Sequence, residues 1–235
     1  MTSRRDRVPF DPRHFERLAQ DGVTYSAHQA FEYIYRSHHW TGSESASGEG
    51  AGLDQTAHLR LALPNLLRDL QTRTLLDLPC GDFSWVRQMD LPVTEYVGAD
   101  LLPSLVSEHQ ARHADDRHRF ITLDLRTDDL PAADLLLCRD CLVHLSFADI
   151  ALALNNIKRS GISYLLTTTF PDCDRNEDTV TGDWRVLNLE RAPFSFSPPL
   201  RLLNENCTEG GGAFRDKSLG LWRVEDTPNA SNFDF

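Results

Sequence analysis

Lysine is nearly absent from this sequence, and basic residues as a whole are outnumbered by acidic ones. The 235 residues include 24 Lys and Arg against 35 Asp and Glu, which gives a formal net charge of −11 at pH 7. Binding to nucleic acid or to an anionic membrane surface needs a basic face that attracts phosphate. The composition therefore argues against both kinds of partner, and the only basic run is Arg4, Arg5 and Arg7 near the start.

Long apolar runs are also lacking. No segment approaches the roughly 20 apolar residues of a membrane-spanning helix, and the basic start is not followed by the apolar segment of a signal peptide. We therefore expect a soluble, cytoplasmic protein. The length suits one generous α/β domain, or such a domain with a helical cap, and is ample for a buried core.

The chain has only five cysteines, an odd number, and most of them lie in apolar stretches of the sequence. This pattern favours reduced thiols in a cytosol over a disulfide framework. Cys138 and Cys141 form a C-x-x-C pair, but a zinc site needs a second pair at matching spacing and a redox motif needs a thioredoxin-like context. The sequence offers neither, so we predict no metal site and interpret the pair as buried cysteines.

The central part of the chain alternates apolar strand patterns with helical ones. Strands are predicted at 74–78, 95–99, 120–123, 134–138 and 163–169, with helices at 103–113 and 147–159. Regular alternation of this kind predicts a doubly wound, mostly parallel, Rossmann-like α/β sheet. Two late strands, at 200–204 and 218–224, are joined by a glycine-rich loop without a long helix. They predict an antiparallel hairpin at the edge of a seven-stranded sheet.

Helical patterns at 13–19, 26–38 and from 53 or 54 to 70 precede this core, and Pro64 predicts a kink or break in the third. A Gly/Ser-rich stretch, 40–52, lies between the last two patterns. Its composition fits a flexible linker, but small residues also suit a lid that closes over a ligand, and we favour the lid. We therefore expect a helical cap or lid segment at 1–71, a core at 72–225 and a loose tail at 226–235.

The most informative stretch is 74–83, with the sequence T-L-L-D-L-P-C-G-D-F. A short apolar strand ends at Asp77, the chain turns through Pro79, Cys80 and Gly81, and residues 84–90 could continue as a helix. A strand, a tight turn and a helix together build a nucleotide-type pocket at the end of a parallel sheet. A single glycine turn is a weak signal, and any buried strand followed by a helix would fit it as well.

Three acidic residues strengthen the interpretation, because Asp77, Asp100 and Asp124 each end a predicted strand. The carboxyl ends of parallel strands line a common crevice where ligands bind. Any one such residue is more often a turn or cap residue, but three in register favour a ligand site. A carboxylate after the second strand can accept from both hydroxyls of a ribose. A dinucleotide site would need the full G-x-G-x-x-G beneath its phosphates, whereas here one glycine is followed by an acid.

From residue 40 to 224 the chain resembles a bacterial group of small class I S-adenosylmethionine (SAM) methyltransferases. The motifs that carry the resemblance are D-L-P-C-G-D-F at 77–83, C-R-D-C-L-V-H-L at 138–145 and G-D-W-R-V-L-N-L at 182–189. Pro79 and Phe83 stand where this family usually has glycine. The resemblance implies SAM as cofactor, with Asp77 near its cationic groups, Asp100 on the ribose and Asp124 on the adenine amino group. It implies no acceptor. The cofactor-binding residues that we expect are Trp40, Ser43, Asp77, Pro79, Cys80, Gly81, Asp82, Asp100, Leu101, Asp124, Leu125 and Arg139.

The methyl acceptor is expected above the ends of the fourth and fifth strands. Asp140 and His144 are the candidate catalytic residues, because a histidine pKa is ordinarily about 6.5, near working pH. Alternatively, His144 bonds only to the backbone at a helix start and Asp140 caps a loop. Thr169, Asp183 and Trp184 are candidate substrate-binding residues, since an aromatic face and a carboxylate together suit a ring-bearing, sugar-like acceptor. A surface turn with one buried tryptophan fits the last two residues equally well.

The function that we predict is methyl transfer from SAM to a small polar metabolite, on oxygen rather than nitrogen or carbon. Two alternatives stay open on the same fold. One is an enzyme that cyclises or cleaves SAM without an acceptor, and the other is a non-catalytic scaffold. The sequence does not fix the acceptor, the methylated atom, or whether the protein pairs as a homodimer.

Overall fold

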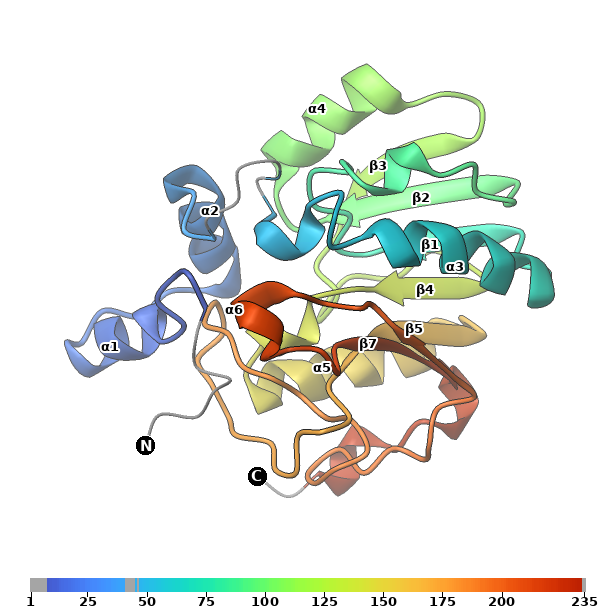
Figure 1. The fold of residues 1–235 in the computed structure, drawn as a ribbon. Coiled ribbons are helices and arrows are strands. Elements are labelled where there is room, and N and C mark those ends of the chain that lie inside the picture. The colour runs from blue at the N-terminus through green and yellow to red at the C-terminus, as the bar shows by residue number, and fades with distance from the viewer. Residues whose placement is uncertain (1–7, 41–44, 46, 234–235) are drawn as a thin grey trace.

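Seven strands form one twisted sheet in the order β3-β2-β1-β4-β5-β7-β6. We describe a computed structural model of the chain, in which residues 8–40, 45 and 47–233 are described (Figure 1). Short apolar runs rich in Leu and Val form the central strands because both faces of the sheet are covered. The strands are β1 (Thr74–Asp77), β2 (Glu95–Asp100), β3 (His118–Thr122), β4 (Leu135–Cys138), β5 (Tyr164–Thr169), β6 (Arg201–Asn204) and β7 (Ser218–Arg223).

The direction of the strands changes at one edge of the sheet. The first five strands pair in parallel, whereas β7 lies antiparallel between β5 and β6. This arrangement confirms the predicted fold class, a doubly wound, mostly parallel α/β sheet with an antiparallel edge hairpin. The parallel strands end together at one edge, which is where the polar residues of interest lie.

Helices cover both faces of the sheet and one of its edges. Figure 1 shows α1 and α2 standing apart from the rest, beyond the carboxyl ends of the strands. The α-helices are α1 (His14–Gln20), α2 (Ala27–Ser37), α3 (Ala57–Asp69), α4 (Pro103–His113), α5 (Phe147–Arg159) and α6 (Glu209–Gly212). Short 3₁₀ turns are η1 (Glu49–Ala51), η2 (Val86–Gln88), η3 (Leu142–His144), η4 (Val224–Asp226) and η5 (Ala230–Asn232).

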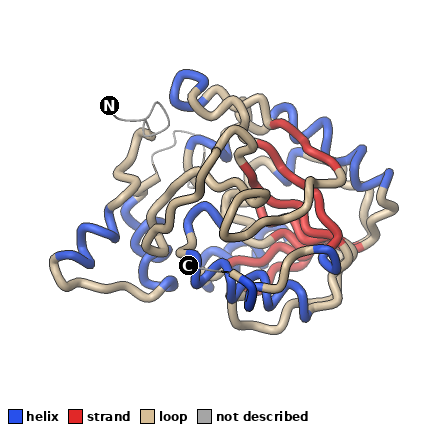
Figure 2. Tube along the Cα trace, turned by 90° about the horizontal axis from the view of Figure 1, so that it is seen from below, coloured by secondary structure: helices blue, strands red, loops and turns tan. Residues whose placement is uncertain are grey.

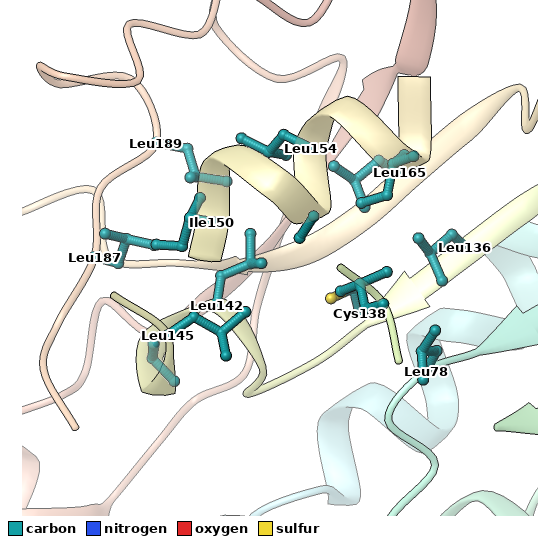
Figure 3. Close-up of a cluster of buried hydrophobic side chains, with 14 of the residues drawn as sticks. Leu78, Leu136, Cys138, Leu142, Leu145, Ile150, Leu154, Leu165, Leu187 and Leu189 are labelled. Atoms are coloured by element: carbon teal, nitrogen blue, oxygen red, sulfur yellow. The ribbon is translucent and has the colours of Figure 1, made fainter. Parts of the chain in front are cut away.

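Alternate residues of the strands divide between two hydrophobic cores. Leu76 and Leu136 face α5 in one core, while Leu75 and Leu135 face α3 in the other. Figure 3 shows the first core, where Ile150 and Leu154 of α5 pack beside strand residues and beside leucines of the 170–199 segment, which joins β5 to β6. A sheet buried on both faces fixes where each strand ends, and hence where the strand-end side chains are placed.

Two local predictions differ from the structure. The helix expected at 84–90 is reduced to the 3₁₀ turn η2, which ends at Gln88, and Met89 is already extended. Of the kink or break expected at Pro64, the break is not observed, because α3 runs without interruption from Ala57 to Asp69. Its apolar face is buried along its whole length, and that packing outweighs the hydrogen bond that proline cannot donate. The buried residues of that face are Leu59, Leu63, Leu66 and Leu67.

Residues 226–233 of the loose tail that we expected at 226–235 are packed on the core, while residues 234–235 lie outside the described residues. Residues 226–233 pack along α5, with Ala230 buried and the Phe233 ring 5.4 Å from that of Phe194. Figure 2 shows the strands side by side, flanked by helices and by long loops. Within the described residues, no helix has both the length and the apolar composition needed to cross a bilayer.

Candidate functional site

A cavity opens at the carboxyl ends of β1, β2 and β4, and residues of α2 form part of its wall. The space between its walls, including the open mouth, is about 1190 Å³. Strand-end acids and the turn after β1 form its floor. The α2 residues that line it are Ala27, Phe31, Ile34 and Tyr35.

The turn after β1 depends on Gly81. This residue has φ +53°, in the left-handed region that favours glycine, and a Cβ there would lie 2.5 Å from Ser47 Oγ. Ser47 Oγ in turn accepts a hydrogen bond from Asp82 N at 3.1 Å. The turn is therefore shaped to let the Gly/Ser-rich segment approach its backbone closely.

Asp77, at the end of β1, is buried beside the cavity. Its Oδ2 accepts a hydrogen bond of 2.6 Å from the Tyr96 hydroxyl, which comes from the neighbouring strand β2. Burial raises the pKa of Asp77 to about 7, although the hydrogen bond from Tyr96 opposes that rise. A carboxylate in this state gains strongly from a cation placed next to it.

Asp100, at the end of β2, ties that strand to the glycine turn. Its Oδ1 accepts from Leu102 N at 3.1 Å and its Oδ2 from Gly81 N at 3.2 Å. Gly81 O lies 2.8 Å from His109 Nε2 on α4. Burial raises the pKa of Asp100, while the two backbone N–H groups oppose that rise.

Asp124 follows β3 and is bound by a neighbouring arginine. Arg126 donates to both oxygens, with Nε 2.9 Å from Oδ1 and Nη2 2.7 Å from Oδ2, and it also reaches Asp149 of α5 at 2.9 Å. Burial alone would raise the pKa of Asp124, but the bonds from Arg126 lower it. The structure thus brings Asp77, Asp100 and Asp124 to one cavity, and among the contacts of the described residues only Asp124 is bound by a side-chain cation.

Arg139 and Asp140, after β4, belong to an ionic cluster that also contains Glu205, Glu209 and Lys217 from the β6–β7 region. Arg139 pairs with Glu205 through Nε at 3.2 Å and Nη2 at 2.7 Å, and Lys217 Nζ lies 2.7 Å from Asp140 Oδ2. Lys217 is also 3.7 Å from Glu205 and 3.8 Å from Glu209. Two buried cations therefore meet three carboxylates at this end of the cavity.

Asp140 is partly buried and lines the cavity together with Arg139. It has φ +51°, and its own N–H donates to Thr168 Oγ1 at 2.8 Å, which holds the turn. Burial alone would raise its pKa, but the ammonium of Lys217 and the guanidinium of Arg139 hold the pKa of Asp140 well below its usual range. Asp140 is therefore a permanent anion and a weak base.

His144, at the end of η3, is buried with its ring 4.3 Å from that of Trp40. Its Nδ1 lies 3.1 Å from Asp183 O. A carbonyl can only accept, so Nδ1 carries the proton and Nε2 is left as an acceptor. Burial lowers the pKa of His144 to about 4, so the ring is neutral near pH 7. The backbone bond fits the structural alternative for His144, yet the residue also lines the cavity.

The Gly/Ser-rich segment contacts both ends of the cavity. Ser45 Oγ donates to Asp82 Oδ2 at 2.7 Å, next to the glycine turn. Gly50 O accepts from Arg139 Nη2 at 2.7 Å, and a Cβ on Gly50 would lie 3.0 Å from Lys217 Nζ. The described part of this segment is thus packed over the site.

The three candidate substrate-binding residues do not line the cavity. Asp183 is buried with both oxygens used as the cap of α1, accepting from Phe15 N and Glu16 N at 2.8 Å each. Thr169 is buried and its Oγ1 accepts from Leu189 N, while the Trp184 ring packs on Phe214 and Phe170. Their positions favour structural roles, and their predicted role in substrate binding has no support from this geometry.

All but one of the expected cofactor residues line the cavity, as do both candidate catalytic residues. The exception, Ser43, lies outside the described residues. Sequence reasoning missed Tyr96, Ser47, Arg126, Glu205 and Lys217. Strand register could have pointed to Tyr96, because it lies two residues before Gly98, the partner of Asp77, and therefore on the same face of the sheet. No sequence signal places Lys217 beside Asp140, because 77 residues separate them.

Neither a protein-family model nor a curated protein matches this sequence. Human N-acetylserotonin methyltransferase, solved in complex with SAM, is similar over 91% of this chain and 63% of its own, with 18% identity and a TM-score of 0.53. The N-methyltransferase NodS from Bradyrhizobium japonicum WM9 is similar over 73% and 96%, with 13% identity and a TM-score of 0.53. The methyltransferase domain of bacterial CtHen1 is similar over 50% of this chain and 66% of its own, with 14% identity and a TM-score of 0.43.

This chain thus spans less than two thirds of the human enzyme. The two similarities with a TM-score of 0.53 establish the fold alone, which is the fold of those SAM-dependent methyltransferases.

Proposed function

We propose that this protein is a SAM-dependent methyltransferase that methylates a small polar metabolite on oxygen. The observation that carries the proposal is the convergence of Asp77, Asp100 and Asp124 on one cavity beside the glycine turn. The fold supports the same conclusion, because its parallel strands end at the crevice where α/β sheets bind ligands. An acidic cavity suits a cofactor with two cationic groups and repels a pyrophosphate.

The residues present fit SAM. Asp77 would stand near the sulfonium and ammonium groups, Asp100 would accept from the ribose hydroxyls, and the segment at Asp124 and Leu125 would border the adenine. Trp40 lines the cavity, and its buried Nε1 has no hydrogen-bond partner among the described residues, which leaves a donor for a ligand. When bound, SAM would supply an electrophilic methyl group on its sulfonium, whose sulfur would leave as a neutral thioether.

The acceptor end of the cavity favours a hydroxyl. His144 Nε2 is an acceptor that can orient an O–H group, since Asp183 O fixes the proton on Nδ1. Asp140 already has Lys217 and Arg139 beside it, at 2.7 and 3.3 Å, which disfavours a cationic amine as its ligand. Neither residue is a strong base, so alignment and exclusion of water would make the larger contribution.

We further propose that the first 71 residues act as a cap on this site. Residues of α2 line the cavity, Ser45 is bonded to Asp82 in the glycine turn, and Gly50 is bonded to Arg139. Excluding water above the methyl group is what such a cover would contribute. A soluble, cytoplasmic location and the absence of nucleic-acid partners belong to the same proposal, on the basis of the net charge of −11.

The cofactor is tested by calorimetry and thermal unfolding with S-adenosylhomocysteine. At a hundredfold excess over Kd, binding should stabilise the native state by about 2.7 kcal/mol and raise Tm by about 5 to 10 °C. Asp100→Asn should lose most of that shift, while Asp116→Asn should keep it, because Asp116 is an exposed acid in the loop before β3, at the opposite edge of the sheet from the cavity. No heat and no shift at millimolar ligand would remove the proposal.

The acceptor is tested by incubating the protein with labelled SAM and a host metabolite extract. An O-methyl product is expected, and an N-methyl product would contradict the oxygen assignment. With the acceptor in hand, His144→Ala should lower kcat by roughly ten- to a hundredfold. His144→Gln, which keeps an acceptor oxygen, should lose less. Full turnover by His144→Ala would reject its assigned role.

A further inference from the structure

Tyr96 and Asp77 form a buried pair at the floor of the cavity. The Tyr96 hydroxyl donates to Asp77 Oδ2 at 2.6 Å, and the two residues are 0% and 2% exposed. They lie on adjacent parallel strands, where Leu76 pairs with Val97 between them. A short bond between two fully buried groups fixes the carboxylate in one orientation.

Tyr96 is itself held rigidly and stands behind the cavity wall. Its ring packs against Phe83, His118 and Phe120 at centroid distances of 5.2, 5.6 and 6.0 Å. Asp77 lines the cavity and Tyr96 does not. Any influence of the phenol on a bound molecule therefore passes through the carboxylate.

We infer that Tyr96 is a positioning residue, which holds the Asp77 carboxylate against the cofactor and sets the pH below which cofactor binding weakens. This inference rests on the proposed function, because it assumes a cationic ligand at Asp77. The proton that Asp77 gives up when the ligand binds passes to the solvent.

Two charged groups, Asp100 and Arg139, act on the ionisation of Asp77. Asp100 from β2 opposes its ionisation and Arg139 from β4 favours it, while the thiol of Cys80 adjoins it from the turn. His109 of α4 acts on the same region through Asp100. Burial is the largest influence and places the pKa of Asp77 at about 7. The apoprotein therefore holds this proton below neutral pH, and a cationic ligand displaces it.

Removing the phenol hydroxyl changes this balance in a defined direction. The hydrogen bond from Tyr96 lowers the pKa of Asp77, so Tyr96→Phe raises it. Below that pKa, affinity for a cationic ligand falls by about tenfold for each pH unit. The fall should begin near pH 7 in the natural protein and at a higher pH in Tyr96→Phe.

The experiment is calorimetric titration of the full chain with SAM, from pH 5.5 to 8.5, in two buffers of different ionisation enthalpy. The natural protein should release close to one proton per SAM bound at pH 6, and fewer at pH 8.5. Tyr96→Phe should bind SAM at least several-fold more weakly at pH 7 and approach the natural affinity at pH 8.5. The amino group of SAM titrates equally in both experiments, so it cancels in the comparison.

Tyr164→Phe is the matched control, because Tyr164 lies in β5 with its ring beneath Arg223 and away from the cavity. Coincident pH profiles for Tyr96→Phe and Tyr164→Phe would overturn the inference while leaving the proposed function intact. No binding of SAM by the natural protein at any pH would remove the proposed function instead. If Tyr96→Phe fails to fold, proton release by the natural protein decides, and none at pH 6 overturns the inference.

Discussion

The position of Gly81 imposes two constraints that only glycine satisfies together, a positive φ and no room for a Cβ. Its φ of +53° disfavours any side chain, and the Gly/Ser-rich segment approaches it so closely that a Cβ would collide with Ser47. Gly161 shares only the first demand, since it has φ +76° but a Cβ there would meet no atom within 4 Å. The two glycines therefore separate backbone strain from steric collision.

Gly81→Ala should destabilise the protein more than Gly161→Ala does. The strain alone costs about 1 kcal/mol, and the collision adds to it and displaces Ser47. Urea unfolding measures the stability. Calorimetry should show that Gly81→Ala alone lowers the affinity for S-adenosylhomocysteine, by about tenfold or more. The double variant Gly81→Ala with Ser47→Gly should recover part of both losses. Equal effects of the two single variants would contradict this account.

Single acids at strand ends could be predicted from sequence, but their partners could not. Asp77 and Asp100 follow apolar runs, so the strand pattern alone places them at a sheet edge. The Tyr96 hydroxyl bond and the Gly81 N–H bond depend on which strands are neighbours and in what register. The protonation state of each carboxylate depends on those partners. The sequence therefore predicted which residues lie at the site but not how their pKa values are shifted.

Two elements far apart in the chain, the turn after β4 and the edge hairpin, meet in the ionic cluster. Lys217 immediately precedes β7 and neutralises Asp140, Glu205 and Glu209 together with Arg139. Removing one cation would leave buried carboxylates with a single counter-ion, which is costly in a low-dielectric interior.

Lys217→Met should therefore lower the free energy of unfolding by about 3 to 5 kcal/mol. Arg223→Met at the other end of the same strand is the control, because the Arg223–Glu225 pair is 3.9 Å long and its side chains are 49% and 76% exposed. It should cost about 1 kcal/mol or less. Chemical denaturation measures both, and a small loss for Lys217→Met would show that the cluster does not stabilise the hairpin.

Helices and strands with a regular hydrophobic pattern could be predicted from sequence. Features that depend on packing against other parts of the fold could not. The five parallel strands and the edge hairpin follow from their patterns and connections. The continuous path of α3 through Pro64 depends on how fully its apolar face is buried. The packing of Ala230 and Phe233 along the core is likewise a tertiary effect that the polar composition of the last residues conceals.

At the scale of the whole molecule, Asp77 couples stability to pH. Its pKa is about 3.9 in an unfolded chain and about 7 in the folded one. An acid whose folded pKa is raised contributes stability that is fully present below the unfolded value and is lost as pH rises through the folded value. The apoprotein should therefore lose stability from Asp77 between about pH 4 and pH 7.

Asp77→Asn should escape this loss. At pH 8 it should exceed the natural apoprotein in stability by an amount on the order of 1 to 4 kcal/mol, and at pH 4 the difference should be much smaller. Urea unfolding at the two pH values measures it, with Asp116→Asn as the control. The same variant should bind SAM poorly, so it would gain stability and lose function. Parallel pH profiles for natural protein and variant would refute the coupling.

The capping of α1 by Asp183 bears on how this protein can be shortened. Both carboxylate oxygens of Asp183 are bonded to the backbone of that helix, and Gly182 is pressed against the Phe15 ring. A version trimmed to begin after residue 24 for easier expression would leave the Asp183 carboxylate without the two N–H donors that now hold it. Trimmed proteins should therefore also carry Asp183→Asn, and homologues that lack α1 are expected to have lost the acid as well.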